Sequence, residues 1–276
     1  MYPIISTEEL VPRVHLYRVA APRIAKKAAA GQFLILRVDE NGERIPLTIA
    51  DWDASEGTVS VVFMEVGTTT TKLGRLKAGD NIADIVGPLG NPTEVENFGT
   101  VCLMAGGFAT ATIMPIARAM KAAGNRVITI VGARNKDLLF WRDRLSAVSD
   151  ELIITTDDGS AGRRGVVTEP IKEMLERGER IDRVIAIGPS IMMKFSSLTT
   201  KPFGVKTIVS MNPIMVDGTG MCGCCRVSVA GQTRFACVDG PEFDAHAIDW
   251  DNFMVRQRSY VDEEKRSLEK CRCPSA

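Results

Sequence analysis

Two patterns of apolar residues divide most of the chain. Over roughly the first hundred residues, short β-branched or apolar runs are separated by polar segments with turn chemistry, and no strong helical periodicity lies between them. This pattern predicts an antiparallel β barrel with one short helix near residues 70–76. The predicted strands are Phe33–Val38, Pro46–Ala50, Thr58–Val66 and Asn81–Val86.

From about Gly99 the pattern changes to apolar strands that alternate with amphipathic helices. Such alternation predicts βαβ units and a parallel sheet covered on both faces, with ligands at the carboxyl ends of the strands. The expected strands are Thr100–Met104, Arg126–Val131, Glu151–Thr156, Arg183–Ile187 and Val205–Val209. The expected helical stretches are Ala109–Ala123, Lys136–Val148, Val167–Arg177 and Ser190–Ser197. The predicted fold class is therefore a β barrel plus a Rossmann-like α/β domain.

The last part of the chain is rich in glycine and cysteine. A hairpin is expected from Arg226–Ala230 and Thr233–Cys237, followed by a charged helix over Asp262–Lys270. We expect three domains: a barrel over residues 1–97, the α/β domain over residues 98–209, and a small C-terminal segment with a tail over residues 210–276.

Composition narrows the function classes. The 34 Lys and Arg residues balance 34 Asp and Glu residues, which argues against a nucleic-acid or membrane-surface partner. No apolar run approaches the roughly 20 residues that span a bilayer, and the N-terminus lacks signal-peptide character, so we expect a cytoplasmic protein. The only two histidines, His15 and His246, are expected to be structural or exposed. No multi-histidine metal site and no catalytic triad are predicted.

Six of the seven cysteines lie in the last 55 residues. In a reducing compartment, clustered cysteines favour metal binding or redox chemistry over disulfides. A plant-type [2Fe–2S] site has the spacing C-x4-C-x2-C with a distant fourth cysteine. Cys222 and Cys225 supply the x2 step, Cys237 is the distant ligand, and Asp217 stands where the first cysteine is expected. Because a carboxylate is anionic and can ligate iron, we predict Asp217, Cys222, Cys225 and Cys237 as the metal ligands.

Two alternatives remain for these cysteines. A zinc site would use Cys222 and Cys225 with a second pair, Cys271 and Cys273, although their one-residue spacing is poor for zinc. The second alternative is a run of surface cysteines that binds no metal. Cys224 competes for a ligand position, but the register fits its neighbours better.

Small and polar residues follow the predicted α/β strands and form a candidate dinucleotide site. Gly106 and Gly107 join the first strand to its helix, where a pyrophosphate can approach the helix N-terminus, although a tight turn explains them nearly as well. Arg134 follows the second strand and is a phosphate or ribose ligand or a surface arginine. Asp157 and Asp158 follow the third strand, and one of them is expected to begin a turn.

Several motifs resemble the ferredoxin–NADP reductase superfamily. They are RIPLTI at residues 44–49, Gly31-Gln32-Phe33, Gly67–Thr71 and Gly87–Gly90. The order of flavin barrel, nicotinamide domain and C-terminal [2Fe–2S] segment resembles the electron-transfer subunits of dihydroorotate dehydrogenase B and their relatives. Within that family, RIPLTIAD, AIGPSIMMK and DGTGMCGCC are most similar to the small subunits of NADH-dependent reduced ferredoxin:NADP⁺ oxidoreductases, which are electron-bifurcating transhydrogenases often labelled sulfide dehydrogenases.

The resemblance implies roles for particular residues. FAD is expected to contact the barrel through Pro46, Leu47, Thr48, Phe63, Met64, Gly67, Thr69 and Thr70. NAD(H) is expected to contact Gly106, Gly107, Phe108, Gly132, Arg134, Asp158, Gly159 and Gly188. Three positions depart from the family pattern: Ile45 replaces the usual arginine, Ala109 a glycine and Ile187 a common cysteine.

The implied protein is an NAD(P)H-dependent flavin and iron–sulfur oxidoreductase subunit with FAD, a [2Fe–2S] cluster and NAD(H) as cofactors. It would exchange hydride between NAD(H) and FAD and pass single electrons to a larger flavin and iron–sulfur subunit in a heterodimer, with ferredoxin reached only through that partner. Hydride transfer between these cofactors needs no protein acid or base, so no catalytic residue is expected. The alternatives are the electron-transfer subunit of dihydroorotate dehydrogenase itself, which normally has four cysteine ligands, and a non-enzymatic NADH-binding redox sensor.

Overall fold

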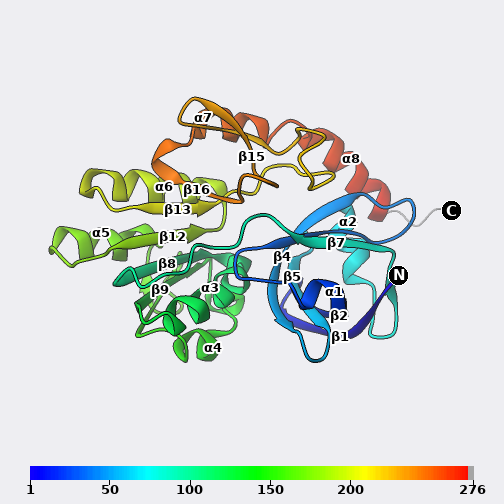
Figure 1. Cartoon of the computed structure of the whole chain (residues 1–276), viewed down its shortest axis with the longest axis horizontal. Helices are drawn as coiled ribbons and strands as arrows, with labels where there is room; N and C mark the ends of the chain where they lie inside the picture. The colour runs from blue at the N-terminus through cyan, green and yellow to red at the C-terminus, as the bar shows by residue number, and fades with distance from the viewer. Residues whose placement is uncertain (273–276) are drawn as a thin grey trace.

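The N-terminal part of the chain forms a nearly closed antiparallel barrel in the computed structural model, which describes residues 1–272 (Figure 1). The strand order is β6-β1-β2-β5-β4-β3-β7. The strands are β1 (Tyr2–Val11), β2 (Val14–Ala20), β3 (Phe33–Arg37), β4 (Arg44–Asp53), β5 (Thr58–Met64), β6 (Asn81–Ile82) and β7 (Asp84–Leu89), with helices α1 (Pro22–Ala25) and α2 (Thr68–Gly74). The barrel and its short helix are as predicted.

Strands β1 and β2 were not among the strands that the sequence pattern predicted. Most side chains of β1 are exposed, including the consecutive polar residues 6–9, so the strand lacks the alternation that identifies a half-buried strand. It forms because its backbone pairs with β2, from Ile4 opposite Val19 to Val11 opposite Val14. Pairing with a neighbour thus overrides a weak local pattern.

The α/β domain has a seven-stranded sheet of order β11-β10-β9-β8-β12-β13-β16, parallel except for β16. Its strands are β8 (Thr100–Gly106), β9 (Arg126–Ala133), β10 (Glu151–Thr156), β11 (Arg163–Arg164), β12 (Arg183–Ile187) and β13 (Thr207–Ser210). Its helices are η1 (Gly107–Ala109), α3 (Thr110–Ala122), η2 (Lys136–Leu138), α4 (Arg142–Ser146), α5 (Thr168–Glu176), α6 (Ser190–Thr200) and η3 (Lys201–Phe203). The parallel α/β architecture is confirmed.

The amphipathic stretch over residues 136–148 is divided into the short helices η2 and α4. Only five residues form α4, because Trp141 has a left-handed backbone with φ of 54° that interrupts the helix. The rings of Phe140 and Trp141 pack edge to face with centroids 5.7 Å apart, and Phe140 is buried. This aromatic contact replaces the helical turn that the amphipathic pattern suggested.

The C-terminal segment lies across both preceding parts (Figure 1). It contains β14 (Arg226–Val229), β15 (Gln232–Phe235), β16 (Glu242–Asp244), η4 (Ala245–Ala247), α7 (Trp250–Arg256) and α8 (Val261–Arg272). Strand β16 extends the α/β sheet by pairing with β13. Helix α8 lies beside α2, where Ser267 Oγ is 2.8 Å from Thr68 Oγ1. Cys271 belongs to α8, whereas Cys273 lies outside the described residues.

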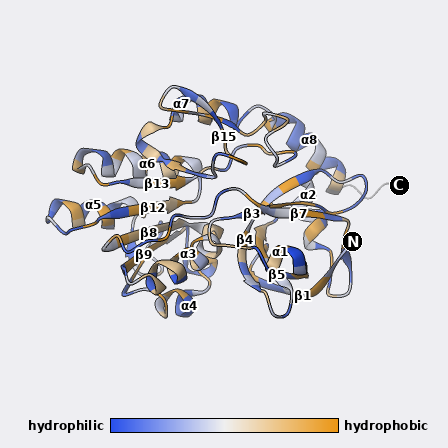
Figure 2. Cartoon of the chain, in the orientation of Figure 1, coloured by the Kyte–Doolittle hydropathy of each residue, from blue (hydrophilic) through white to orange (hydrophobic). Residues whose placement is uncertain are grey.

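One apolar core joins the three parts. It includes Phe33 and Ile35 from the barrel, Met104 from the α/β sheet, and Cys225 and Cys237 from the C-terminal segment. Figure 2 shows apolar residues along the inner strands and mostly hydrophilic residues on α8. Because the core is continuous, the parts are held in a fixed arrangement. No helix within residues 1–272 is long and apolar enough to cross a membrane.

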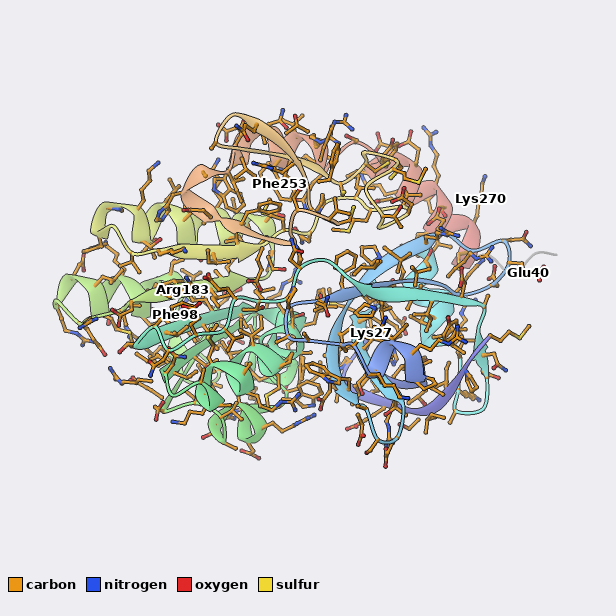
Figure 3. All side chains as sticks on the ribbon, viewed as in Figure 1. Lys27, Glu40, Phe98, Arg183, Phe253 and Lys270 are labelled. Carbon is orange, nitrogen blue, oxygen red and sulfur yellow. The ribbon has the colours of Figure 1, made fainter. Side chains whose placement is uncertain are left out.

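The connection between barrel and α/β domain is fastened by a buried arginine. The guanidinium of Arg183 lies 3.6 Å from the ring centroid of Phe98 and donates to Glu94 Oε2 at 2.8 Å (Figure 3). The Arg183 side chain is only 6% exposed, so its contact with the Phe98 ring is largely desolvated, whereas the Glu94 side chain is 57% exposed. Both contacts fix the course of the connection before it enters β8.

Candidate functional site

A cleft of about 950 Å³ lies between the barrel and the α/β domain. The barrel contributes Phe33, Pro46, Thr48 and Met64 to one wall. The opposite wall is formed by residues at the carboxyl ends of the parallel strands, the place where ligands bind in open α/β sheets. The cleft therefore brings together the two surfaces for which the sequence predicted different cofactors.

Nine of the sixteen predicted cofactor-binding residues line this cleft. They are Pro46, Thr48, Met64, Gly106, Gly107, Phe108, Gly132, Arg134 and Gly188. The other seven, Leu47, Phe63, Gly67, Thr69, Thr70, Asp158 and Gly159, do not line it. Phe63 is 1% exposed and packs edge to face with Tyr17 inside the barrel.

The predicted pyrophosphate residues on α2 make local contacts. Thr70 Oγ1 accepts hydrogen bonds of 3.0 Å from the N–H groups of Val66 and Gly67, and thereby caps the helix. The hydroxyl of the buried Thr69 donates to Glu43 Oε2 at 3.2 Å. These hydrogen bonds hold the start of α2 and the loop before it in place. Any contact with the FAD pyrophosphate would have to be made from this loop.

Glycine is required where β8 and β12 approach each other at the cleft. A Cβ on Gly106 would lie 2.6 Å from Met192 Sδ and 2.8 Å from Pro189 Cδ. Gly188 has φ of 158°, which residues with a side chain rarely adopt. Met192 and Pro189 fill the space beside Gly106, whereas the space beside Gly107 is open and leaves room for a ligand.

Arg13 is a charged cleft residue that the sequence did not predict. Arg13, at the tip of the β1–β2 hairpin with φ of 66°, lines the cleft and donates to the carbonyl of Glu65 at 2.5 Å. A non-glycine residue in this backbone region signals a constrained turn, but the sequence offered no sign of it. Asp157 also lines the cleft. Arg44 does not, and its guanidinium instead lies 3.9 Å from Asp84 on the barrel exterior.

Neither histidine lies in the cleft wall. His15 Nε2 is 2.6 Å from Glu65 Oε1, and His246 Nε2 is 3.0 Å from Thr200 Oγ1. Both side chains therefore have contacts within the protein fold.

The predicted cluster ligands lie on one loop and the following hairpin. The carboxylate of Asp217 accepts hydrogen bonds from the N–H groups of Thr219 at 2.7 Å and Cys222 at 2.9 Å. The Thr219 bond is the main reason that the pKa of Asp217 is below its usual value. The carboxylate is thus anionic at neutral pH, as an iron ligand must be.

The other two predicted ligands form a buried pair. Cys225 Sγ and Cys237 Sγ are 3.2 Å apart and both side chains are buried. Burial raises the pKa of Cys237 to about 12, with a further contribution from Cys225. A cation would be needed to hold the Cys237 sulfur as a thiolate.

The donor set fits a binuclear cluster. Within residues 1–272, no three His, Cys, Asp or Glu side chains are arranged to hold one metal ion. A [2Fe–2S] cluster requires two protein ligands at each iron. Cys225 and Cys237 would hold one iron, and Asp217 and Cys222, joined by their hydrogen bond, would hold the other.

The cluster loop lies directly on the barrel. A Cβ on Gly218 would be 2.7 Å from Leu89 Cδ1 and 2.8 Å from Ile35 Cγ1, and this glycine has φ of 76°. Strand β3, which contains Ile35, also supplies Phe33 to the cleft. Because residues two apart on a strand point to the same face, the cluster loop and the cleft are neighbours along one face of β3.

These features define a class: a ferredoxin reductase-like barrel and α/β domain, with an iron–sulfur segment attached. The chain matches the iron–sulfur cluster binding domain of dihydroorotate dehydrogenase B over residues 212–249, a range that contains all four predicted ligands. The structure has a TM-score of 0.92 to a solved structure described as an NADH-dependent reduced ferredoxin-NADP oxidoreductase, with 48% identity and coverage of 98% of this chain and 97% of that one.

Curated relatives are similar to this chain over most of its length. A Thermotoga maritima protein named as a homolog of the dihydroorotate dehydrogenase B (NAD(+)) electron transfer subunit is 49% identical over 97% of this chain and 94% of its own length. A Desulforamulus reducens electron transfer subunit of dihydroorotate dehydrogenase B is 29% identical, covering 90% and 97%. The chain belongs to this family of electron-transfer subunits. It is an oxidoreductase subunit of the type that uses FAD, NAD(H) and an iron–sulfur cluster.

Proposed function

We propose that this chain exchanges hydride between NAD(H) and FAD in the cleft and passes single electrons through a [2Fe–2S] cluster to a larger flavoprotein subunit. The complete enzyme would be an electron-bifurcating NADH-dependent ferredoxin:NADP⁺ oxidoreductase. The similarity to the solved oxidoreductase, at 48% identity over nearly the whole chain, supports this assignment. So does Asp217 in the position of a cysteine ligand.

The observation that carries the proposal is the adjacency of the three candidate cofactor surfaces. One cleft has barrel residues on one side and strand-end glycines on the other, so a flavin and a nicotinamide bound there would face each other. The cluster loop contacts Ile35 on the strand that also supplies Phe33 to the cleft. When bound, FAD can take up an electron pair and release single electrons, which an iron–sulfur cluster can carry.

The chain's own residues would orient the cofactors. Pro46, Thr48 and Met64 would hold the flavin on the barrel wall, while the open space beside Gly107 would leave room for the nicotinamide. Thr69 and Thr70 would contact the FAD pyrophosphate only through atoms not already used in their local hydrogen bonds. None of these roles requires a side chain to gain or lose a proton.

The direct test is anaerobic addition of NADH to the purified holoprotein. The proposal predicts bleaching of the flavin and cluster absorbance over roughly 400–550 nm, since both groups lose visible absorption on reduction. A spectrum that does not change with NADH would reject the hydride step. The same titration after iron removal should still bleach the flavin contribution.

A second candidate is the electron-transfer subunit of dihydroorotate dehydrogenase B. The iron–sulfur domain match and the names of several relatives favour it. Co-purification from the native source, followed by cofactor analysis of the partner, separates the two. A partner with its own FAD and [4Fe–4S] clusters supports the bifurcating enzyme, whereas a partner with FMN alone and dihydroorotate-dependent reduction supports the second candidate.

A further inference from the structure

A carboxylate of the barrel holds two arginines of the α/β domain. Asp51, near the end of β4, accepts from Arg118 of α3 at 2.9 Å through Oδ1 and from Arg144 of α4 at 3.2 Å through Oδ2. Each carboxylate oxygen therefore has its own guanidinium partner. Within residues 1–272, no other ion pair joins a barrel strand to a helix of the α/β domain. We call these three side chains the Asp51 clasp.

A β-bulge aims Asp51 at the α/β domain. The pairing of β4 with β5 shifts by one residue between Ile49 and Asp51, which leaves Ala50 as the extra residue. Ile49 and Ala50 are both buried, so the inward and outward alternation of the strand is broken here. Ala50 packs in one apolar cluster with Ala111 of α3, and β4 lies against this helix (Figure 1). Because a bulge re-aims the side chains beside it, the end of β4 is turned toward α3.

An indole ring lies beside each arginine of the clasp. The guanidinium carbon of Arg118 is 5.5 Å from the ring centroid of Trp52, and that of Arg144 is 4.1 Å from the ring centroid of Trp141. Trp52 belongs to the barrel but packs against the apolar core of the α/β domain. Exposed ion pairs usually contribute little to stability, because their side chains are mobile and solvated. Here a ring restrains each guanidinium, so the clasp is better suited to fixing a geometry than to adding stability.

The two elements joined by the clasp also form opposite walls of the cleft. Strand β4 presents Pro46 and Thr48 to the cleft and continues to Asp51. Helix α3 presents Thr112 to the cleft and continues to Arg118, less than two turns later. Asp51 and Arg118 do not line the cleft themselves. The clasp therefore connects the barrel wall to the α/β wall from outside the cofactor site.

We propose that Asp51 is a positioning residue: by holding Arg118 and Arg144, it sets the separation of the two walls at which a hydride passes from NADH to FAD. The inference rests on the proposed hydride exchange in this cleft. In that step NADH gives up a proton and two electrons together, FAD receives them, and NAD⁺ remains. The reacting atoms must lie about 3–3.5 Å apart, and a displacement of about 1 Å can slow such a step about 100-fold. Dinucleotide binding to the α/β wall is less demanding, so a loosened clasp should affect the rate more than the affinity.

Anaerobic stopped-flow mixing of the oxidised holoprotein with saturating NADH tests this, because the rate constant of flavin bleaching does not depend on how much of the protein is folded. Asp51→Asn keeps the size of the side chain and the oxygen that accepts from the Trp52 N–H at 3.0 Å, but removes the charge. It should lower the rate constant about tenfold and change the NAD⁺ affinity, measured by equilibrium titration, by less than about twofold. Adding Arg118→Gln to Asp51→Asn should slow the reaction no further, since both substitutions break the same contact.

Two further measurements exclude a general effect of charge. Glu179→Gln is the matched control, because Glu179 pairs with Arg126 inside the α/β domain and its side chain is 27% exposed, against 28% for Asp51. This variant should leave the rate constant and the affinity unchanged. Salt screens partly exposed ion pairs, so the wild-type rate constant should fall as the ionic strength rises. The rate constant of Asp51→Asn should be nearly independent of ionic strength.

The outcomes separate this inference from the proposed function. A wild-type rate constant in Asp51→Asn, an equal loss in Glu179→Gln, or the same salt dependence in Asp51→Asn as in the wild type overturns the role of Asp51. Losses that multiply in the double variant would show that Asp51 does not act through Arg118 and also overturn it. So would a fall in NAD⁺ affinity without a change in the rate constant, which would make Asp51 a binding residue. Absence of flavin bleaching in the wild type would reject the hydride step itself.

Discussion

Asp217 has two roles that can be separated by substitution. Its carboxylate holds the N–H groups of Thr219 and Cys222, which shapes the loop, and in our proposal it also ligates iron. An asparagine keeps an oxygen that can accept these hydrogen bonds but lacks the negative charge. A cysteine provides an anionic sulfur but loses the oxygen acceptors.

We therefore expect Asp217→Asn to bind iron at least about 10-fold more weakly, by analogy with the cost of perturbing metal-site ligands, while Asp217→Cys retains the cluster. Iron and acid-labile sulfide per chain, together with the electron paramagnetic resonance spectrum of the reduced protein, measure this. Cys224→Ser is the control and should keep its full iron content. Unchanged iron and an unchanged spectrum in Asp217→Asn would exclude Asp217 as a ligand.

Glu242 sits where the barrel and the C-terminal segment meet. Thr93 donates to its Oε1 at 2.6 Å, and burial raises the pKa of the Glu242 carboxyl above its usual value. A raised pKa in the folded state means that the stabilising contribution is complete below the unfolded-state pKa. It is lost as the pH rises through the folded-state pKa.

Glu242→Gln should therefore raise the melting temperature at neutral pH and have little effect near pH 4. If the gain is about 1 kcal/mol, the rise for a protein of this size is about 2–4 °C. Scanning calorimetry at several pH values measures it, with the exposed Glu40→Gln as control (Figure 3). A lower melting temperature at neutral pH would show that the carboxylate is ionised and stabilised, for example by Arg183 nearby.

The contrast between Asp157 and Asp158 shows how far residues can be assigned from sequence. The strand-end position of both was predictable from the βαβ pattern. Which one turns the chain depends on the hydrogen bond from Ser160 to Asp158, which is a tertiary detail. The predicted cluster ligands, by contrast, could be placed on one loop and hairpin from the cysteine spacing. In the structure they lie in two pairs, Asp217 with Cys222 and Cys225 with Cys237, whose members are only 5 and 12 residues apart in the chain.

At the scale of elements, helix α2 depends on a buried tyrosine from a strand distant in sequence. The Tyr17 hydroxyl is within hydrogen-bonding distance of the carbonyls of Leu73 at 2.9 Å and Leu76 at 2.6 Å. The Leu73 carbonyl lies in the last turn of α2 and also accepts from the N–H of Leu76 at 3.0 Å, whereas Leu76 itself follows the end of the helix at Gly74. Burial raises the pKa of Tyr17 to about 12, so the phenol is the neutral donor in the folded protein.

Tyr17→Phe should reduce the free energy of unfolding by about 1–3 kcal/mol, since it removes the hydroxyl that donates to the Leu76 carbonyl. Urea denaturation measures the change. Tyr2→Phe is the matched control and should have a small effect, because the structure gives the Tyr2 hydroxyl no hydrogen-bond partner among residues 1–272. A Tyr17→Phe protein as stable as the wild type would show that water reaches these carbonyls.

The pairing of β1 with β2 also explains why these two strands were not predicted from the sequence. Tyr17 is buried on the inner face of β2, but its partner β1 is mostly exposed. Such a strand is defined by its neighbours in the sheet and not by its own residues. The strands of the α/β sheet, by contrast, are buried on both faces. They could therefore be predicted from their continuous apolar runs.

At the scale of the whole molecule, the shared core has a functional consequence. Phe33 in the cleft wall and Cys225 and Cys237 in the cluster segment belong to one packed set of side chains. Rigid packing would keep a flavin in the cleft and a cluster in the loop at a constant separation. Loss of the cluster should therefore lower the number of electrons that the chain takes up, without abolishing dinucleotide binding.

Cys237→Ser tests this separation, because it removes one of the two buried thiols while leaving the cleft wall intact. FAD takes up two electrons and a [2Fe–2S] cluster one, so anaerobic reduction of the wild type should consume about three electrons per chain. The variant should consume about two and still bind NAD⁺ with wild-type affinity. Cys102→Ser, a buried cysteine away from the loop, controls for thiol loss and should retain three. A variant that still takes up three electrons would show that Cys237 is not needed to hold the cluster, whereas loss of NAD⁺ binding would show that the segment also maintains the cleft.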